Sequence, residues 1–600
     1  MAMSTYEDRL TALRAELAAR RLDGFVIPLT DEHMSEYVGG YAQRLAWLTG
    51  FQGSAGSAVV LPADAAIFTD GRYTLQVREQ VDGAHWSYQP VPQTSIAAYL
   101  ARHAPDGGRI GYDPWLHTRE WVVQAGAALA AKGAELVAVD TNPVDAVWPD
   151  RPAPSAAKLI VHPDAYAGRV AADKRQSLAD WLVTHRADAT VLAALDSIAW
   201  TFNIRGSDVA CTPVALAYAV VHADATADLF VAPEKMADDV LQHLGNAVRV
   251  HPRDDFASYL QGLGGQRIAV DPAQSVAAIF GALEAGGARI LEARDPTVLP
   301  RAVKNDAEIA GQRAAQARDG AALTRFLHWL SIEAPKGGLT ELSAAAKLEE
   351  FRRAGGDLID LSFDTISGAG QNGAICHYRV DEQSNRPITL DSLYLIDSGG
   401  QYRDGTTDVT RTVAVGTPTD EMRDRFTRVL KGHIALARAV FPEGTVGGQL
   451  DVLARQYLWA AGLDYPHGTG HGVGSFLSVH EGPQRISAAW SSQAGGGEPL
   501  RAGMILSNEP GYYKEGEYGI RTENLLLVER RQVPGAEQPL LGFETLTFAP
   551  IDRSLIDVDL LDRTELAWLN DYHAQVRDRI GPQLDGDAKH WLDAVTAPIA

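Results

Sequence analysis

Two segments of the N-terminal half repeat one pattern, and this repeat constrains the fold more than any other feature of the chain. The segments "LAWLTGFQGSAGSAVV" and "IAWTFNIRGSDVACTPVALAYAVV" carry Ala, Trp, Gly and Ser at the same internal spacing, about 150 residues apart. The shared positions are Ala46, Trp47, Gly53 and Ser54 in the first copy and Ala199, Trp200, Gly206 and Ser207 in the second. Because this offset matches the usual size of a domain, the repeat predicts one α/β unit used twice.

The flanks of the two copies also correspond. Each copy follows an amphipathic helix ("RLTALRAELAARR" and "KRQSLADWLVTHR") and an apolar strand ("GFVIP" and "TVLAAL"). Each precedes further predicted strands, "AAIFTDGRYTLQV" and "ADLFVAP". The Pro-rich stretch "VWPDRPAPSAAK" lies between the copies and is typical of a junction. We therefore place a first α/β domain at residues 1–150 and its duplicate at residues 151–304.

A different kind of domain follows. Pro300 ends the preceding element, and Asn305 or Asp306 is a suitable N-cap for a long helix. The strands predicted after it are punctuated by glycine, as in "SLYLIDSGGQY" and "GMILSNEPGYY", and long helices lie between them. The Gly/Ser-rich stretch "SAAWSSQAGGGEP" predicts a surface loop, and "RTELAWLNDYHAQVRDRI" predicts a closing helix. We assign residues 305–600 to this third domain.

Composition narrows the class of protein. The chain has 54 basic and 76 acidic residues, a net charge of −22, which argues against a nucleic-acid-binding surface and against anionic membranes. Cys211 and Cys376 are the only cysteines and form no CxxC motif, which favours a reducing compartment. The N-terminal stretch lacks the apolar core of a signal peptide, and no run of eighteen apolar residues occurs. These features predict a cytoplasmic protein.

The stretch "DYPHGTGHGVGS" holds two histidines, His467 and His471, four positions apart. In a helix, this spacing would place both imidazoles on one face, as in some metal-dependent proteases. The four glycines between and after them make a helix improbable, since each costs about 1 kcal/mol relative to alanine. We therefore expect the two histidines to lie in non-helical backbone.

Four carboxylates of the same domain lie at the ends of apolar strands. Asp397 ends the run "LYLID", Asp408 opens "DVTRTVAVG", Glu509 follows "ILSN" and Glu523 precedes "NLLLV". Taken singly, Asp397 is better explained as setting a turn, and Asp408 as capping or edging a strand. Together with His471, however, they are too many buried charges for a passive core unless a cation is present.

The donor set suggests which cation. Oxygen-rich ligands with one imidazole suit Mn²⁺, Zn²⁺, Co²⁺ or Fe²⁺, whereas a structural zinc site would prefer cysteine. A pair of divalent cations would neutralise the carboxylates and lower the pKa of a water between them, giving a nucleophile at neutral pH.

The same motifs carry a resemblance to a known family. "IDSGGQYRDGTTDVTRT", "PHGTGHGVG", "SNEPGYY" and "GIRTEN" resemble the dinuclear aminopeptidases of the pita-bread fold, metallopeptidase family M24, and within it the three-domain form of aminopeptidase P (Xaa-Pro aminopeptidase). Matches at "SEYVGGYAQRLAWLTGFQGSAG", "AWTFNIRGSDV" and "RAVKNDAEIAG" extend the resemblance over essentially the whole chain. It implies an α/β and α+β fold: two similar N-terminal α/β domains of the creatinase type (RNase H-like), then a C-terminal pita-bread catalytic domain.

The resemblance also assigns residue roles. It implies two divalent metal ions, usually Mn²⁺, held by Asp397, Asp408, His471, Glu509 and Glu523. It makes His377, His467, His480 and Glu509 catalytic, with Glu509 moving a proton toward the leaving proline nitrogen. It places His377, His467, His480, Tyr513, Arg521 and Arg205 on the substrate. The glycines around His471 would let the backbone pass close to metals and substrate.

The implied activity is hydrolysis of the bond between an N-terminal residue and a following proline, in Xaa-Pro-Yaa peptides, by a hydroxide that bridges the metals. The implied assembly is a homodimer. One alternative is prolidase, which has the same fold and ligand order but cleaves only Xaa-Pro dipeptides. Another is a pita-bread domain without metals, either a creatinase-type enzyme or a protein-binding module, against which the complete ligand set argues. A partner-binding role for the N-terminal half stays open.

Overall fold

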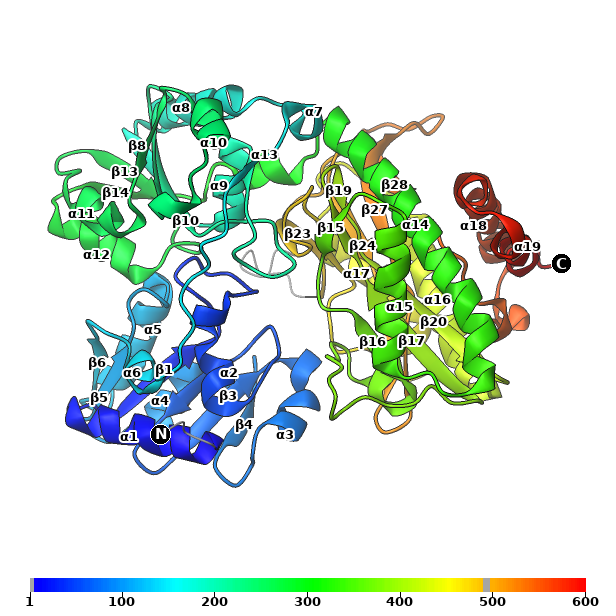
Figure 1. Cartoon of the computed structure of the whole chain (residues 1–600), viewed down its shortest axis with the longest axis horizontal. Helices are drawn as coiled ribbons and strands as arrows, with labels where there is room; N and C mark the ends of the chain where they lie inside the picture. The colour runs from blue at the N-terminus through cyan, green and yellow to red at the C-terminus, as the bar shows by residue number, and fades with distance from the viewer. Residues whose placement is uncertain (1–4, 489–496) are drawn as a thin grey trace. The chain divides into compact units, whose positions relative to one another are not determined.

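The computed structural model describes residues 5–488 and 497–600, and the chain divides into two compact units (Figure 1). Unit 1 contains Met1–Pro163 and Arg169–Val298, and unit 2 contains Asp164–Gly168 and Leu299–Ala600. Most of the stretch that predicts a Gly/Ser-rich loop, residues 489–496, lies outside the described residues. We describe each unit by itself.

Unit 1 contains two sheets of the same design. In the described residues the first has six strands in the order β4-β3-β2-β1-β5-β6, and the second has six in the order β12-β11-β10-β8-β13-β14. In each, the central strand is parallel to one neighbour and antiparallel to the other (β1 with β5 and β2; β8 with β13 and β10). This identity of strand order and direction confirms two similar α/β units, whereas the boundaries at residues 150 and 304 stay predictions.

The first unit of this pair consists of α1 (Tyr6–Ala19), β1 (Gly24–Pro28), α2 (Arg44–Thr49), β2 (Ser57–Val60), β3 (Ala65–Thr69), α3 (Gln76–Gln80), β4 (Ser87–Pro90), α4 (Ile96–His103), β5 (Arg109–Tyr112), α5 (Arg119–Ala130), β6 (Glu135–Ala138) and α6 (Pro143–Val147). The strand predicted over residues 65–77 is wrong beyond Thr69. The carboxylate of Asp70 accepts a hydrogen bond from the backbone N–H of Arg72 and begins a 3-10 turn there instead.

The second consists of α8 (Ala171–His185), β8 (Ala189–Leu192), α9 (Leu195–Phe202), β10 (Ala217–His222), β11 (Ala227–Val231), α10 (Asp238–Leu244), β12 (Val248–His251), α11 (Phe256–Gln261), β13 (Arg267–Val270), α12 (Ala277–Ala285) and β14 (Arg289–Glu292). The tryptophans of the repeat, Trp47 and Trp200, are both buried on the short helices α2 and α9, each of which follows the central strand of its sheet. The repeated tryptophans therefore lie on equivalent helices of the two copies.

Unit 2 opens on the long helix α14 (Asp306–Glu333). Asn305 is its N-cap and forms a capping box with Glu308, which confirms the predicted start. Its apolar face packs against α15 (Glu341–Ala354) and against β17 (Ser392–Ser398) and β20 (Val409–Val415), as Figure 1 shows. The predicted core residues of this face are all buried: Leu323, Phe326, Leu327 and Leu330.

Two antiparallel sheets form the centre of unit 2. One has the order β16-β17-β20 and the other β21-β28-β27-β24-β22-β23, and smaller sheets join β15, β18 and β19, and β25 with β26. The remaining strands are β15 (Leu358–Leu361), β16 (Ile366–Ala369), β18 (Gly400–Tyr402), β19 (Gly405–Thr406), β21 (Val440–Pro442), β22 (Gly470–Gly472), β23 (Glu481–Ile486), β24 (Ile505–Asn508), β25 (Gly511–Lys514), β26 (Tyr518–Arg521), β27 (Asn524–Arg531) and β28 (Leu540–Thr545).

Helices cover the outer faces of these sheets. The larger sheet packs on α16 (Asp420–Ala437) and α17 (Gly447–Trp459) through Leu436, Leu450 and Ala454. The predicted closing helix is present as α18 (Arg563–Ile580), and a further helix that the sequence did not predict, α19 (Gly586–Val595), follows it. Among the residues that the structure describes, we find no helix with the length and hydropathy needed to cross a membrane.

Candidate active site

His471 lies on β22 with its ring orientation fixed by a backbone carbonyl. Its Nδ1 is 2.9 Å from the carbonyl oxygen of Gly472, and because that oxygen only accepts, Nδ1 carries the hydrogen. Nε2 points at two carboxylates, with Asp408 Oδ2 at 3.5 Å and Glu509 Oε1 at 3.4 Å. A neutral imidazole with one nitrogen hydrogen-bonded and the other facing acids is the usual arrangement of a metal-binding histidine.

The two sheets bring the four carboxylates to this imidazole. Asp397 is the buried penultimate residue of β17, and Asp408 directly precedes the neighbouring strand β20. In the larger sheet Asn508 pairs with Asn524, so Glu509 and Glu523 leave the paired strands β24 and β27 at the same edge. The pleated ladder thus places residues that are distant in sequence side by side.

The resulting cluster is buried and strongly negative. One ligand atom each of Asp408, His471 and Glu523 lies within 4.8 Å of the others. Burial, together with the charges of Asp397 and Glu509, raises the pKa of Asp408 well above its usual range. Burial and the charge of Asp408 do the same to the pKa of Glu523, and burial raises that of Glu509. Protein groups alone leave this charge poorly compensated.

The donor set fits divalent cations. The Oδ1 atom of Asp397 is buried and has no hydrogen-bond partner among the described residues, although a buried carboxylate oxygen is costly to leave unpaired. Oxygen donors with one imidazole match the preferences of Mn²⁺ and its neighbours. The residues that would hold the cations are Asp397, Asp408, His471, Glu509 and Glu523.

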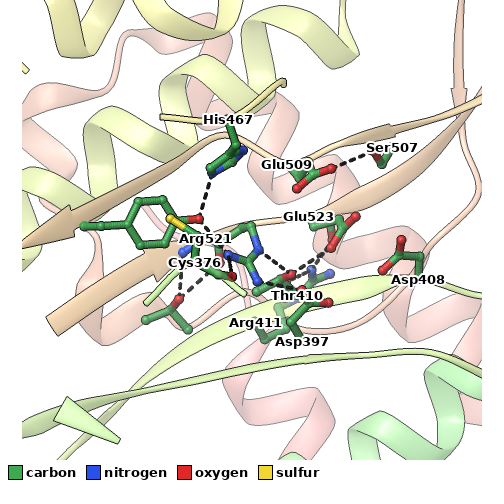
Figure 2. A network of polar contacts seen from close by, with 12 residues as sticks. Cys376, Asp397, Asp408, Thr410, Arg411, His467, Ser507, Glu509, Arg521 and Glu523 are labelled. Carbon is green, nitrogen blue, oxygen red and sulfur yellow. Dashed lines mark hydrogen bonds and ion pairs between the residues drawn. The ribbon is translucent and has the colours of Figure 1, made fainter. Parts of the chain in front are cut away.

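Arg521 lies beside the carboxylates and is 2 % exposed. Its guanidinium donates to Asp397 Oδ2 at 2.5 Å and to the hydroxyl of Tyr513 at 2.6 Å. It also donates to Thr410 Oγ1 and to the carbonyl of Cys376, as Figure 2 shows. Thr410 in turn donates to Glu523 at 2.7 Å. Arg521 therefore offsets part of the negative charge and orients Asp397; direct contact between Arg521 and substrate stays a prediction.

His467 points into the same network from the other side (Figure 2). Its Nδ1 lies 2.8 Å from the carbonyl of Gly468 and its Nε2 lies 2.8 Å from the hydroxyl of Tyr513. Since the carbonyl requires a hydrogen on Nδ1, Nε2 accepts from Tyr513, whose oxygen accepts from Arg521. The ring is half-buried and also packs at 4.9 Å from Tyr465. Through Tyr513, His467 is joined by hydrogen bonds to Arg521, which donates to Asp397.

The other predicted site residues have different positions. The ring of His480 lies 4.4 Å from that of His471, edge to face. His377 is half-buried and follows Cys376, whose carbonyl Arg521 contacts. Arg205 belongs to unit 1, where it is 3 % exposed and donates to the carbonyls of Ala199 and Ile204, each at 3.0 Å. Whether Arg205 reaches the site stays a prediction.

The chain matches family models along most of its length. The model of metallopeptidase family M24 matches residues 310–530 and that of the C-terminal region of peptidase M24 matches residues 539–599. Two models of the creatinase/prolidase N-terminal domain match residues 9–147 and 150–308. The chain is also 41% identical to "Probable Xaa-Pro aminopeptidase P" of Aspergillus clavatus, over 99% of this chain and 93% of that protein. The chain belongs to metallopeptidase family M24.

Further relatives agree with this assignment to M24. "Aminopeptidase P2" of Arabidopsis thaliana is 41% identical, over 96% of this chain and 86% of its own length. Among solved structures, the X-prolyl aminopeptidase of Caenorhabditis elegans, described as a cytosolic enzyme with a di-nuclear active site, matches with a TM-score of 0.94 and 35% identity, over 99% of this chain and 100% of that one. The predicted fold class, two creatinase-type domains followed by a pita-bread M24 domain, is confirmed.

Two glycines of the stretch around His471 allow neighbouring strands to pack closely. The stretch is non-helical, as predicted, and includes the strand β22. A Cβ on Gly470 would lie 2.0 Å from the carbonyl oxygen of Ser507, and one on Gly472 would lie 2.3 Å from that of Glu481. These two glycines therefore permit the close approach of neighbouring strands, and the passage of the backbone beside metals and substrate stays a prediction.

Sequence reasoning missed several residues that support the M24 site. Thr410 accepts a hydrogen bond from Arg521 and donates one to Glu523. The buried Arg352 pairs with Asp319 and donates to Ser398, the residue after Asp397. Lys304 and Arg301 bind the carboxylate of Glu481, the residue after His480. Arg301 and Lys304 lie in the stretch "RAVKNDAEIAG", but nothing in that stretch indicates that they pair with Glu481.

Proposed function

We propose that this protein is an Xaa-Pro aminopeptidase, which releases the N-terminal residue of peptides whose second residue is proline. The observation that carries the proposal is the convergence of Asp408, His471 and Glu523 within 4.8 Å, with Asp397 and Glu509 beside them. Relatives named Xaa-Pro aminopeptidase P match 99% of the chain and support the choice of substrate.

The chemistry suits a bond to proline. Such a bond is a tertiary amide whose nitrogen has no hydrogen, so recognition cannot depend on an amide N–H. Two divalent cations, when bound, supply a Lewis acid for the scissile carbonyl and lower the pKa of water, so that the nucleophile exists at neutral pH. We propose Mn²⁺ as the native metal, with Zn²⁺, Co²⁺ and Fe²⁺ as the alternatives to test.

Glu509 is the residue best placed to move protons. Its side chain is 16 % exposed and accepts a hydrogen bond from Ser507 at 3.1 Å, and its removal from most of the solvent raises its pKa. A carboxylate with a raised pKa takes a proton more readily at neutral pH. In this proposal Glu509 takes the proton of the attacking water and delivers it to the leaving proline nitrogen.

In this proposal, histidines, Tyr513 and arginines around the cluster bind and orient the substrate. Tyr513 donates to His467 Nε2, so the pair presents a fixed hydrogen-bonding edge beside Arg521. We propose that His377, His467 and His480 face the peptide and stabilise the developing charge on its carbonyl oxygen. Tyr513 and Arg521 hold the three histidines in place. We propose that Arg205 also contacts the substrate.

We propose further that the chain functions as a homodimer in the cytoplasm, with domains at residues 1–150, 151–304 and 305–600. The C. elegans relative is described as cytosolic, which supports the location. A single sedimenting species of monomer mass, 64.6 kDa, at micromolar concentration would exclude the dimer.

A peptide panel tests the function. The purified protein, supplied with Mn²⁺, is incubated with Xaa-Pro-Yaa peptides, with Xaa-Pro dipeptides and with Xaa-Ala-Yaa controls. We expect release of the first residue from Xaa-Pro-Yaa, with kcat/KM at least tenfold above that for the other two sets. Cleavage confined to Xaa-Pro dipeptides would show a prolidase instead, and no cleavage of any peptide would exclude both.

A further inference from the structure

A buried histidine outside the predicted set connects the two strands that carry the glutamates. His433 lies on α16 and is 0 % exposed. Its Nδ1 is 3.1 Å from the carbonyl oxygen of Asn508, and its Nε2 is 3.2 Å from the side-chain nitrogen of Asn524. The side chain of Asn508 donates back to the carbonyl of His433 at 2.9 Å. One side chain of a helix therefore contacts both β24 and β27.

The surrounding donors fix the protonation of this ring. Arg411 donates to Oδ1 of Asn524 at 2.9 Å, so the amide nitrogen of Asn524 must face His433. Nε2 of His433 is then an acceptor, and Nδ1 carries the hydrogen and donates to the carbonyl of Asn508. Burial and the nearby Arg411 lower the pKa of His433 to about 3, in agreement with a neutral ring.

The two asparagines are the neighbours of the proposed ligands. Asn508 and Asn524 pair directly across the ladder, and Glu509 and Glu523 are the next residues beyond that pair. Arg411 adds a bond to the carbonyl of Glu523 at 2.6 Å. A shift of either strand at this pair would change the separation of the two carboxylates, and His433 bonds to both strands there.

We propose that His433 is a positioning residue for the metal site: through Asn508 and Asn524 it sets the spacing of Glu509 and Glu523. The proposal rests on the metal site described under the proposed function. Partners that orient metal ligands typically contribute a factor of 10–100 to metal affinity. Helix α16, which covers the larger sheet, would thus influence the metal site through His433 and the two asparagines.

The test compares two buried histidines of the same unit. His573 is also 0 % exposed and accepts the backbone N–H of Ile551 at 3.2 Å, but it contacts neither asparagine. Binding of Mn²⁺ to metal-free protein is measured by calorimetry for the parent, H433F and H573F, with the melting temperature of each metal-free protein. We expect both variants to melt at lower temperature, H433F to bind Mn²⁺ at least tenfold more weakly, and H573F to bind within threefold of the parent. Equal Mn²⁺ affinity in H433F and the parent would overturn the proposal.

Two further variants separate the two bonds and remain informative if H433F fails to fold. The side chain of H433N retains an N–H near the position of Nδ1, and that of H433Q retains an acceptor near the position of Nε2. We expect each to bind Mn²⁺ with an affinity between those of the parent and H433F, with kcat reduced and KM within threefold of the parent. Parent-like affinity in both would contradict the proposal, since it requires both bonds.

A last variant distinguishes failure of this inference from failure of the metal site. D408A removes a proposed ligand and is measured in the same titration. If D408A loses Mn²⁺ while H433F does not, only the role of His433 is wrong. If D408A binds two Mn²⁺ ions like the parent, the metal assignment itself is wrong.

Discussion

At the residue scale, the two histidines of the glycine-rich stretch differ in what they contact. His471 Nε2 faces Asp408 and Glu509, whereas His467 Nε2 accepts from Tyr513. The first arrangement directs Nε2 at the carboxylates that would hold a cation, and the second hydrogen-bonds the ring to Tyr513 beside Arg521. Their spacing of four residues therefore brings the two proposed functions, metal binding and substrate binding, into one stretch of backbone.

Alanine variants should separate these functions. We expect His471→Ala to lose bound metal and peptidase activity together. We expect His467→Ala to retain both metals but to lose a factor of about 10²–10³ in kcat, typical of removing an oriented group that stabilises transition-state charge. Metal content, melting temperature and kcat on an Xaa-Pro-Yaa peptide are measured for both. Equal metal loss in the two variants would contradict this division.

The buried histidines also predict a dependence of stability on pH. Burial, with Arg411 nearby, lowers the pKa of His573 to about 3, below the ordinary value of about 6.5. Between these values the unfolded chain binds the proton and the folded chain does not, so this contribution to stability is complete above pH 6.5 and is lost as the pH falls.

The variant H573F lacks this proton-binding group. Its stability deficit relative to the parent should therefore shrink by about 2 kcal/mol between pH 7 and pH 5. Thermal unfolding of metal-loaded parent and variant at the two pH values measures this change. A deficit that is the same at both pH values would show that His573 is not held neutral.

The candidate ligands could be chosen from the sequence because four acids at the ends of apolar strands and one histidine occur together in one domain and match a family motif, although each acid alone was ordinary. The residues that orient them could not be chosen in this way. Thr410 and Glu523 are 113 positions apart, and His433 and Asn524 are 91 positions apart, so no local pattern connects them. Threonine in a strand and histidine in an amphipathic helix are both ordinary choices, and only the tertiary structure gives them partners.

At the element scale, β22 depends on the absence of side chains. Gly470→Ala would place a Cβ 2.0 Å from the backbone of β24, whereas a Cβ on Gly468 has its nearest neighbour at 3.5 Å, an ordinary contact. We expect Gly470→Ala to destabilise the protein by about 1–3 kcal/mol or more and to weaken metal binding, because His471 follows it directly. Gly468→Ala is the matched control and should leave both properties close to those of the parent. Melting temperature and Mn²⁺ affinity measure the difference; parent-like values for Gly470→Ala would contradict the close packing of β22 on β24.

Elements with a clear start signal were predicted well. Asn305, one of the two predicted N-caps, begins α14, and the predicted glycine-punctuated stretches contain β17 and β20. The strand expected over residues 65–77 ended early because Asp70 caps a turn, a local competition that the apolar pattern does not reveal. Helix α19 was missed because it is short: its ten residues make too few turns for the apolar spacing of a helix to be recognised.

At the scale of the whole molecule, the repeat predicted the largest feature of unit 1. Two short matched segments implied two α/β units, and the two sheets have the same strand order and directions. The order of strands within each sheet could not be derived from the repeat, because it depends on which edges pair in three dimensions. Family membership in M24 then accounts for the whole chain, from the creatinase-type domains to the catalytic domain.

The central claim is that this chain is a peptidase that requires two divalent cations. The measurement that tests it most directly is the rate of release of the N-terminal residue from an Xaa-Pro-Yaa peptide as Mn²⁺ is added to metal-free protein. We predict no release without metal and a rate that reaches its maximum when two Mn²⁺ ions are bound per chain. Release at full rate without metal, or no release after two ions are bound, would contradict the account.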